Sequence, residues 1–369
     1  LVVKKDLVPQ AEPPGMKRGG GTVFYVTRDS HRFLSNRVER NEGGSPNVLA
    51  RVRAGMGFLV KRAVGVERIG AVDAERRKRA ESRFSSNSLL VLLGSSTPGR
   101  HLPTLPFLVR SGPRFLHYNL VSSLLNDLFG VQSRGGCQCA GPYSQLLLGL
   151  GDASNAHVER ALLEKCEVLR PGYTRLSLPY YLSDAAVEYV LGAVDFIAEW
   201  GALFMAEYRV DLRTGEWRHK SRVGRPLGKG RVWMSRLDPG AGWAEALGER
   251  PELEVDEEQA FKDAMTAAEE ARDKLLSNLK SVHGAMKSSA EGGLPEEHEA
   301  LRWFVYPREA AEMVLRTGGR NVKDEGNVEG VVRPTDCEDC EDVEEVKEGK
   351  EGPAVRAVPE TEEEEEEEE

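Results

Sequence analysis

Residues 106–130, PFLVRSGPRFLHYNLVSSLLNDLFG, place a probable strand directly before a helix and decide the class of fold. Residues 106–110 form a short, mostly apolar run, whereas the apolar side chains of 118–129 recur at helical spacing and Gly130 follows as a stop signal. Working outward, strands are predicted at residues 22–27, 88–93 and 174–179. Helices are predicted at 46–64, ended by Gly65, and at 183–201, with Ser183 as the N-cap and Gly201 as the end. Because strands and helices alternate, the sequence predicts an α/β or α+β fold.

The composition predicts a folded body followed by an acidic tail. The chain has 369 residues, of which 40% are hydrophobic, and this excludes a wholly disordered protein and suggests two domains. Residues 322–369 carry 21 acidic and 5 basic residues and end in eight glutamates, so we expect this segment to be disordered. The remaining residues carry 39 acidic and 45 basic side chains, an excess too small to favour a nucleic-acid-binding module.

The five cysteines favour an intracellular, reducing compartment, with the cytoplasm preferred, because their number is odd and too small for a disulfide scaffold. The apolar segment 189–208 is interrupted by Asp195 and Glu199 at helical spacing. It therefore predicts a buried amphipathic helix and no membrane partner. The chain opens on Leu1 in an apolar run typical of a strand interior, without a targeting segment, so we expect the C-terminal part of a longer protein.

The first candidate site is the turn at residues 42–46, EGGSP. Ser45 is predicted as the N-cap of the following helix and Pro46 as its first residue. Two glycines before a helix N-terminus let the backbone approach an anion closely, and Ser45 adds a hydroxyl donor. The turn therefore fits a phosphate site, although a purely structural helix cap accounts for the same residues.

The second candidate site is the segment 134–142, RGGCQCAGP. Glycines around the thiols and Arg134 five residues before Cys139 can hold a thiolate in an electropositive loop. Both cysteines could instead be small buried hydrophobic residues. No second cysteine pair lies at zinc-finger spacing within the folded body, so no metal site is predicted.

The third candidate is Arg175, which lies within an apolar strand at residues 174–179. A buried guanidinium needs an anionic partner, and its planar fork matches a carboxylate. An internal aspartate or glutamate, or the carboxylate of a substrate, would serve.

Together, the motifs EGGSPN before a helix, LLNDLFG, RGGCQCAGPY and RLS resemble the class V aminotransferase family over about residues 1–217. These are pyridoxal-phosphate enzymes of fold type I that include cysteine desulfurases and selenocysteine lyases. The resemblance implies the end of the large cofactor-binding domain and a linking helix at 1–70, and a small α+β domain at 71–220. A Gly- and Arg-rich loop, a charged helix expected to be solvent-exposed and a final packed helix are expected at 221–320, before the disordered acidic tail at 321–369. Core character is expected at 301–315.

The resemblance also implies roles for particular residues. Gly44 and Ser45 match the turn that reaches the cofactor phosphate across a homodimer. Cys139 matches the catalytic cysteine of the desulfurase loop, whose arginine falls on Arg134, and Arg175 matches the arginine that binds the substrate carboxylate. The cofactor-linking lysine, its aspartate partner and the stacking aromatic ring belong upstream of these motifs.

The function expected from the resemblance is that of a pyridoxal-phosphate enzyme acting on an amino acid as its small-molecule substrate, present here as a fragment that lacks the lysine. Cys139 would be the nucleophile in a desulfurase, whereas a transaminase needs no thiol. A different class of function is a non-catalytic interaction protein derived from the same family.

Overall fold

The computed structural model describes Lys4, Leu7 and residues 20–94, 102–222, 256–288 and 293–322. Residues 323–369 of the predicted disordered tail and most of the predicted Gly- and Arg-rich loop therefore lie outside the described residues. The tail prediction is wrong at its first residue, because Asn321 is buried and its side chain donates to the carbonyl oxygens of Arg110 and Ala198. The chain divides into two compact units, residues 1–73 and residues 74–369. We describe each unit by itself.

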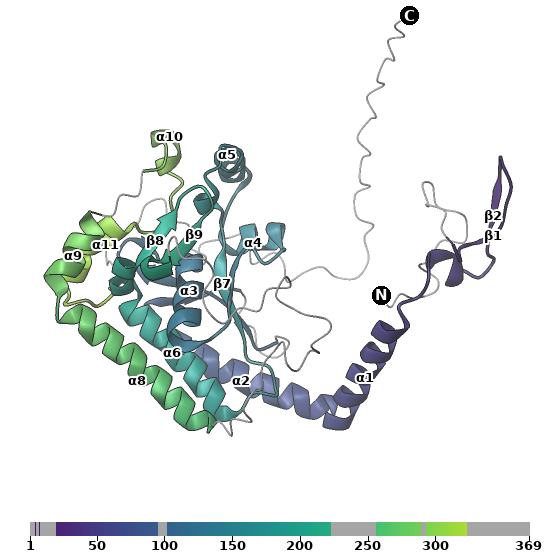
Figure 1. The fold of residues 1–369 in the computed structure, drawn as a ribbon, viewed down its shortest axis with the longest axis horizontal. Coiled ribbons are helices and arrows are strands. Elements are labelled where there is room, and N and C mark those ends of the chain that lie inside the picture. The colour runs from purple at the N-terminus through teal and green to yellow at the C-terminus, as the bar shows by residue number, and fades with distance from the viewer. Residues whose placement is uncertain are drawn as a thin grey trace, which may run out of the picture. The chain divides into compact units, whose positions relative to one another are not determined.

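The N-terminal unit contains a hairpin and a helix (Figure 1). Strand β1 (Val23–Val26) pairs antiparallel with β2 (His31–Phe33), the short helix η2 (Glu39–Asn41) follows, and α1 (Val48–Val64) begins after the EGGSP turn. The N-cap of α1 is Asn47, whose side chain accepts a hydrogen bond from Ala50 N, so the prediction of Ser45 as the cap is wrong. Asn competes for this position as well as Ser does, and here the cap lies two residues later.

A second helix, α2 (Val66–Ser86), follows α1 after one residue and runs from the first unit into the second. Gly65 ends α1 with a φ of 93°, as predicted, but the chain resumes helical structure at the next residue. The prediction missed α2 because its 66–86 segment is rich in charge. Its last turns nevertheless bury Ala80 and Phe84 in the core of the second unit.

The second unit is built on an antiparallel sheet with the order β3-β4-β7-β6, to which the two-residue strand β5 is added beside β4. The strands are β3 (Leu90–Leu92), β4 (Thr104–Ser111), β5 (Arg114–Phe115), β6 (Arg134–Gly136) and β7 (Tyr173–Ser177). Every pair in this sheet is antiparallel. The mixed α/β architecture predicted from the sequence is confirmed, and the pairing is that of an α+β unit.

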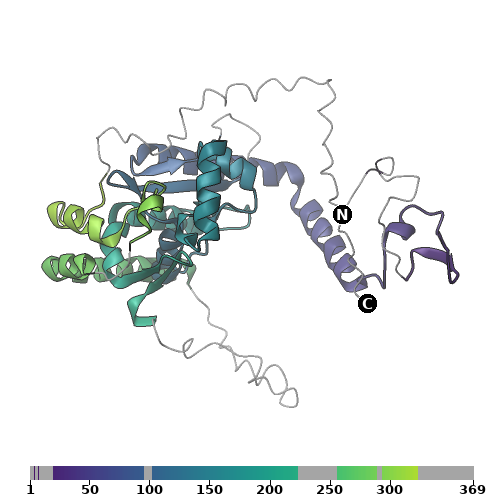
Figure 2. The ribbon, with the colours of Figure 1, turned by 90° about the horizontal axis from the view of Figure 1, so that it is seen from above.

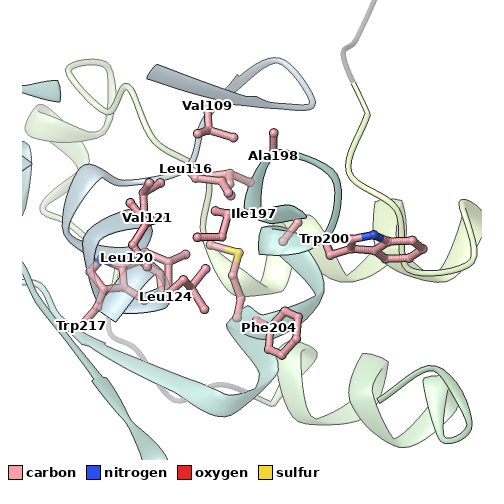
Figure 3. Close-up of a cluster of buried hydrophobic side chains, with 14 of the residues drawn as sticks. Val109, Leu116, Leu120, Val121, Leu124, Ile197, Ala198, Trp200, Phe204 and Trp217 are labelled. Atoms are coloured by element: carbon pink, nitrogen blue, oxygen red, sulfur yellow. The ribbon is translucent and has the colours of Figure 1, made fainter. Parts of the chain in front are cut away.

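One face of the sheet is covered by α3 (Tyr118–Phe129) and α6 (Asp184–Phe204). Figure 3 shows the core that results, in which side chains from β4, α3 and α6 meet. The apolar stripe predicted at 118–129 matches α3 residue for residue, and Gly130 takes the left-handed conformation that ends it. Burying these apolar faces is what holds the sheet and helices together.

Helix α6 is long and apolar enough to pass the length and hydropathy test for a membrane span, but 78% of its apolar window is buried within the structure. It is therefore the central core helix predicted at this position, and Ser183 is its N-cap as predicted. The helix continues through Gly201 to Phe204 instead of ending at Gly201. A Cβ at Gly201 would lie 2.7 Å from Leu116 Cδ1, so this glycine permits close packing and is not a stop signal.

Helix α8 (Glu257–Leu276) lies along α6 and α3 (Figures 1 and 2), so the expectation of a solvent-exposed helix is wrong for one of its faces. The ring of Phe261 stacks on Tyr189 at 4.3 Å, and the Arg272 guanidinium lies 5.2 Å from the Trp200 ring centre. Aromatic and cation–π pairs form much of this contact, so the helix carries few of the aliphatic residues that would have indicated a buried face in the sequence.

The remaining elements complete the second unit around this core. They are α4 (Gly141–Leu147), α5 (Asp152–Leu163), η3 (Glu167–Leu169), η4 (Met205–Glu207), the hairpin β8 (Tyr208–Asp211) and β9 (Glu216–His219), η5 (Lys220–Arg222), α9 (Leu279–Lys287), α10 (Glu296–Glu299) and α11 (Pro307–Arg316). Just before α11, the buried Arg302 pairs with Glu309 at 2.6 Å and with Glu299 at 2.6 Å. The core character predicted at 301–315 is confirmed by the burial of Phe304 and Val305.

Candidate functional site

Two arginines occupy directly opposite positions on β6 and β7. The register of this antiparallel pair places Arg134 across from Arg175. Opposite residues in an antiparallel pair project to the same face of the sheet with their Cβ atoms about 5 Å apart. The two guanidinium side chains therefore start from neighbouring points on one face, which the sequence separation of 134 and 175 could not reveal.

Among the described residues, neither Arg134 nor Arg175 forms an ion pair with a carboxylate. Arg134 is exposed and Arg175 is half-buried. Like charges placed directly opposite each other in a sheet destabilise it, and an anion bound between them removes that cost. This edge of the sheet is therefore suited to a carboxylate or another small anion.

Cys139 lies in a tight turn immediately after β6. Ala140 N donates a hydrogen bond to Cys137 O at 3.0 Å and closes the turn. Both central residues, Gln138 and Cys139, have positive φ values, 58° and 59°. Two consecutive non-glycine residues in this region store backbone strain, which the surrounding contacts must offset.

Those contacts come from Gln138 and Ser144. The side-chain amide of Gln138 donates to the carbonyl oxygens of Arg134 at 3.0 Å, Gly136 at 3.1 Å and Tyr173 at 3.3 Å. The Ser144 hydroxyl on α4 donates to Cys137 O at 2.7 Å. The turn is thus fastened both to the sheet and to the following helix, so the position of Cys139 is fixed by the fold.

The sulfur of Cys139 accepts a hydrogen bond from Arg134 Nη2 at 2.8 Å. Cys139 is exposed, whereas Cys137 is half-buried and Cys166 is buried. Burial raises the pKa of the Cys166 thiol, and the nearby carboxylates of Glu164 and Glu297 raise it further. Cys166 is therefore unsuited to be a nucleophile, and Cys139 is the accessible thiol of the described residues.

Behind this loop lies an aromatic cluster around His117. Its ring is fully buried, stacks on Trp303 at 5.0 Å and lies 4.4 Å from the ring of Tyr118. Burial lowers the pKa of His117 to about 3, although the carbonyl of Val168 opposes that effect. Burial also raises the pKa of Tyr118 to about 12. His117 is therefore neutral and structural, and it caps α3 by accepting from Asn119 N.

The EGGSP turn lies in the other unit, and Gly44 and Ser45 are both exposed. Gly44 has a φ of 82°, and its amide donates to Gly20 O at 2.7 Å. That amide is already bonded to a carbonyl outside the turn, so it is not a free donor for an anion. Among the described residues the Ser45 hydroxyl has no hydrogen-bond partner, so it is the group of this turn that can hold a phosphate oxygen.

Three side chains of the second unit place possible metal-ligand atoms within 4.8 Å of one another, namely Glu164, Glu297 and His298. His298 is buried, and its Nε2 lies 2.7 Å from Glu164 Oε2. This hydrogen bond satisfies the buried ring without an ion, so we assign no metal here. The sequence offered no signal for this group, because the fold brings together Glu164, directly after α5, with two residues of α10.

The model of the Aminotransferase class-V family matches residues 1–190 of the chain. Among solved structures, the chain is similar to the apo cysteine desulfurase from Thermococcus onnurineus NA1, with 23% identity, a TM-score of 0.42 and coverage of 53% of this chain and 42% of that one. It is also similar to the cysteine desulfurase CsdA (S-sulfonic acid) from Escherichia coli, with 20% identity, a TM-score of 0.35 and coverage of 48% and 37%. No curated protein matches the chain. The chain thus spans less than half the length of these two enzymes.

Proposed function

Because the chain belongs to the aminotransferase class-V family, whose members use pyridoxal phosphate, we propose that it carries the substrate-binding and sulfur-accepting part of a cysteine desulfurase-like enzyme. The observation that carries this proposal is the hydrogen bond from Arg134 to the exposed sulfur of Cys139, beside the cross-strand partner Arg175. An anion-binding pair of arginines and an accessible thiol on one sheet edge are what sulfur removal from an amino acid requires.

Arg175 binds the α-carboxylate of the amino acid in this proposal. It is half-buried and has no carboxylate partner among the described residues, so its fork is free to bind a substrate. Arg134 adds a second positive charge on the same face while one of its nitrogens remains on the thiol. A carboxylate held here places the substrate side chain close to the cysteine loop.

Cys139 accepts the sulfur. Its thiolate attacks the sulfur of a cysteine-like substrate, a Cys139 Sγ–sulfur bond forms, and the substrate carbon–sulfur bond breaks with its electron pair passing to the carbon side. The product on the protein is a persulfide. The strained, fastened turn holds the backbone of Cys139 in place before the reaction, and Arg134 binds its sulfur, so less orientational freedom remains to be lost.

Pyridoxal phosphate, when bound, supplies the electron sink that such chemistry needs. The Ser45 hydroxyl would hold one of its phosphate oxygens, and the positive φ of Gly44 lets the turn expose that hydroxyl. Family members are commonly dimeric, and we propose a homodimer in which this turn serves the partner's cofactor. No residue of the chain is assigned to the family's cofactor-linking lysine, so cofactor attachment is not part of this proposal.

The test uses the longest protein that the gene encodes, with pyridoxal phosphate and L-cysteine. Cys139→Ser should abolish persulfide and sulfide formation and leave cysteine binding intact, while Cys166→Ser, the matched control at a buried thiol, should keep sulfide formation. Arg175→Ala should weaken cysteine binding by about 2–4 kcal/mol, the scale for removing one half of a desolvated charge pair.

Three outcomes separate the alternatives. Full sulfide release by the Cys139→Ser protein would rule out this nucleophile. Transfer of the amino group to a keto acid, unaffected by Cys139→Ser, would show a transaminase. Absence of both cofactor and amino-acid binding would show a non-catalytic interaction protein.

A further inference from the structure

The proposed function uses Cys139 and leaves its neighbour Cys137 without a role. The two cysteines flank Gln138 in the closed turn. Cys137 is half-buried and Cys139 is exposed, so the first thiol lies on the protein side of the second. Among the described residues the sulfur of Cys137 makes no hydrogen bond, and it is therefore free to react.

The sequence spacing keeps Cys137 and Cys139 close together. Residues two apart in sequence cannot have Cα atoms more than about 7 Å apart, and disulfides span Cα separations of about 4.4–6.8 Å. The hydrogen bond from Ala140 N to Cys137 O, 3.0 Å long, folds this segment back on itself and shortens the separation further. We therefore expect a bond between the two sulfurs to form within this loop, once the sulfur of Cys139 leaves Arg134.

The contact that competes with this bond is the one with Arg134. Its Nη2 donates to the sulfur of Cys139 at 2.8 Å and holds that sulfur toward the sheet edge. Cys137 stays fixed meanwhile, because Ser144 binds its carbonyl. The sulfur of Cys139 thus has two alternative partners in the loop, the guanidinium of Arg134 and the thiol of Cys137.

We propose, resting on the proposed function, that Cys137 is the resolving thiol for sulfur carried on Cys139. The Cys137 thiolate attacks Sγ of the Cys139 persulfide and forms a Cys137–Cys139 disulfide. The bond between Sγ of Cys139 and the outer sulfur breaks, and the outer sulfur leaves with the electron pair as hydrosulfide. The proton of Cys137 goes to solvent. The Cys137 sulfur is oxidised from the thiolate to the disulfide level, the outer sulfur is reduced to the sulfide level, and Sγ of Cys139 keeps its oxidation level.

This step releases hydrosulfide as its product and leaves a disulfide that must be reduced. The sulfur is delivered as free hydrosulfide without a sulfur-accepting protein. The disulfide must then be reduced by two thiol equivalents, from a dithiol or from glutathione, before Cys139 can accept sulfur again.

The experiment loads sulfur chemically, so that it does not depend on the enzyme reaction. In the full chain, serine replaces Cys166, Cys337 and Cys340, and the protein is treated anaerobically with inorganic polysulfide and then desalted. The parent should release about one sulfide per chain and acquire the mass of an internal disulfide between Cys137 and Cys139. The isosteric variant Cys137→Ser should keep the persulfide on Cys139 and release sulfide at least about tenfold more slowly, because the attack is no longer intramolecular.

Equal rates of sulfide release from parent and Cys137→Ser would overturn the proposal. A parent protein that keeps its persulfide and forms no disulfide would also overturn it, and so would failure of every protein to take up sulfur. The proposal would likewise be overturned if the Cys139→Ser protein kept the sulfur and the Cys137→Ser protein did not. Failure of the proposed function is a separate result, since it shows as absent sulfide formation from L-cysteine while polysulfide loading and disulfide closure still occur.

Discussion

His117 makes the stability of the second unit depend on pH, and the size of that effect follows from its burial. The pKa of its buried ring is lowered to about 3 from an ordinary value of 6.5. The folded state therefore binds fewer protons than the unfolded state below pH 6.5, and stability is lost as the pH falls from there towards 3. At about 1.4 kcal/mol per pH unit, lowering the pH from 7 to 5 should cost about 2 kcal/mol through this one group.

The measurement is urea unfolding at pH 7, 6 and 5, followed by tryptophan fluorescence, because Trp217 and Trp303 pack within 6.3 Å and 5.0 Å of the His117 ring. In the His117→Gln protein the fall in unfolding free energy between pH 7 and 5 should be about 2 kcal/mol smaller than in the parent, whatever the stability at pH 7. His157→Gln, at an exposed histidine, is the matched control and should follow the parent. An identical pH dependence in the parent and His117→Gln would refute the reasoning.

Three further substitutions test other parts of the structure. Gly201→Ala should lower the unfolding free energy by about 1–3 kcal/mol in urea titrations, because its Cβ would lie 2.7 Å from a core leucine. Gly192→Ala on the same helix is the control and should be neutral or stabilising, because its Cβ meets only the ends of two flexible side chains, Met265 at 3.4 Å and Arg83 at 3.8 Å. Asn47→Ala should cost α1 about 1 kcal/mol, seen as faster amide hydrogen exchange in its first turn. Glu309→Gln should cost about 3 kcal/mol in thermal or urea unfolding, because it removes a carboxylate charge from the buried Arg302, and retained stability would show that the pair is dispensable.

The sequence predicted those elements whose signals are local. The apolar stripe and terminal glycine of α3 and the serine cap of α6 were sufficient to place both helices. Gly201 misled the prediction of the end of α6, because a glycine inside a helix can serve packing as well as termination, and only the position of a neighbouring helix decides between them. The cap of α1 was misplaced because Ser45 and Asn47 are both good capping residues.

The sequence indicated which residues form the candidate site, but not how they lie relative to one another. The cysteine loop and the lone strand arginine were visible as unusual residues in their local context. That Arg134 lies opposite Arg175 depends on the register between β6 and β7, which is set by the packing of the whole sheet. The hydrogen bonds of Gln138 likewise join backbone groups of two strands, so no local pattern could indicate them.

Strand β6 also has a consequence for solubility. It is the outer strand of its sheet, only three residues long, and it consists of one arginine and two glycines. A short strand with an exposed charge is a poor template for the edge of a second molecule, so the residues that serve the site also discourage sheet-to-sheet aggregation. Replacing Arg134 by an apolar residue would therefore remove the charge that discourages self-association as well as a group proposed to bind the substrate. Loss of activity in such a variant should be interpreted only after its monomer and oligomer content has been measured by light scattering.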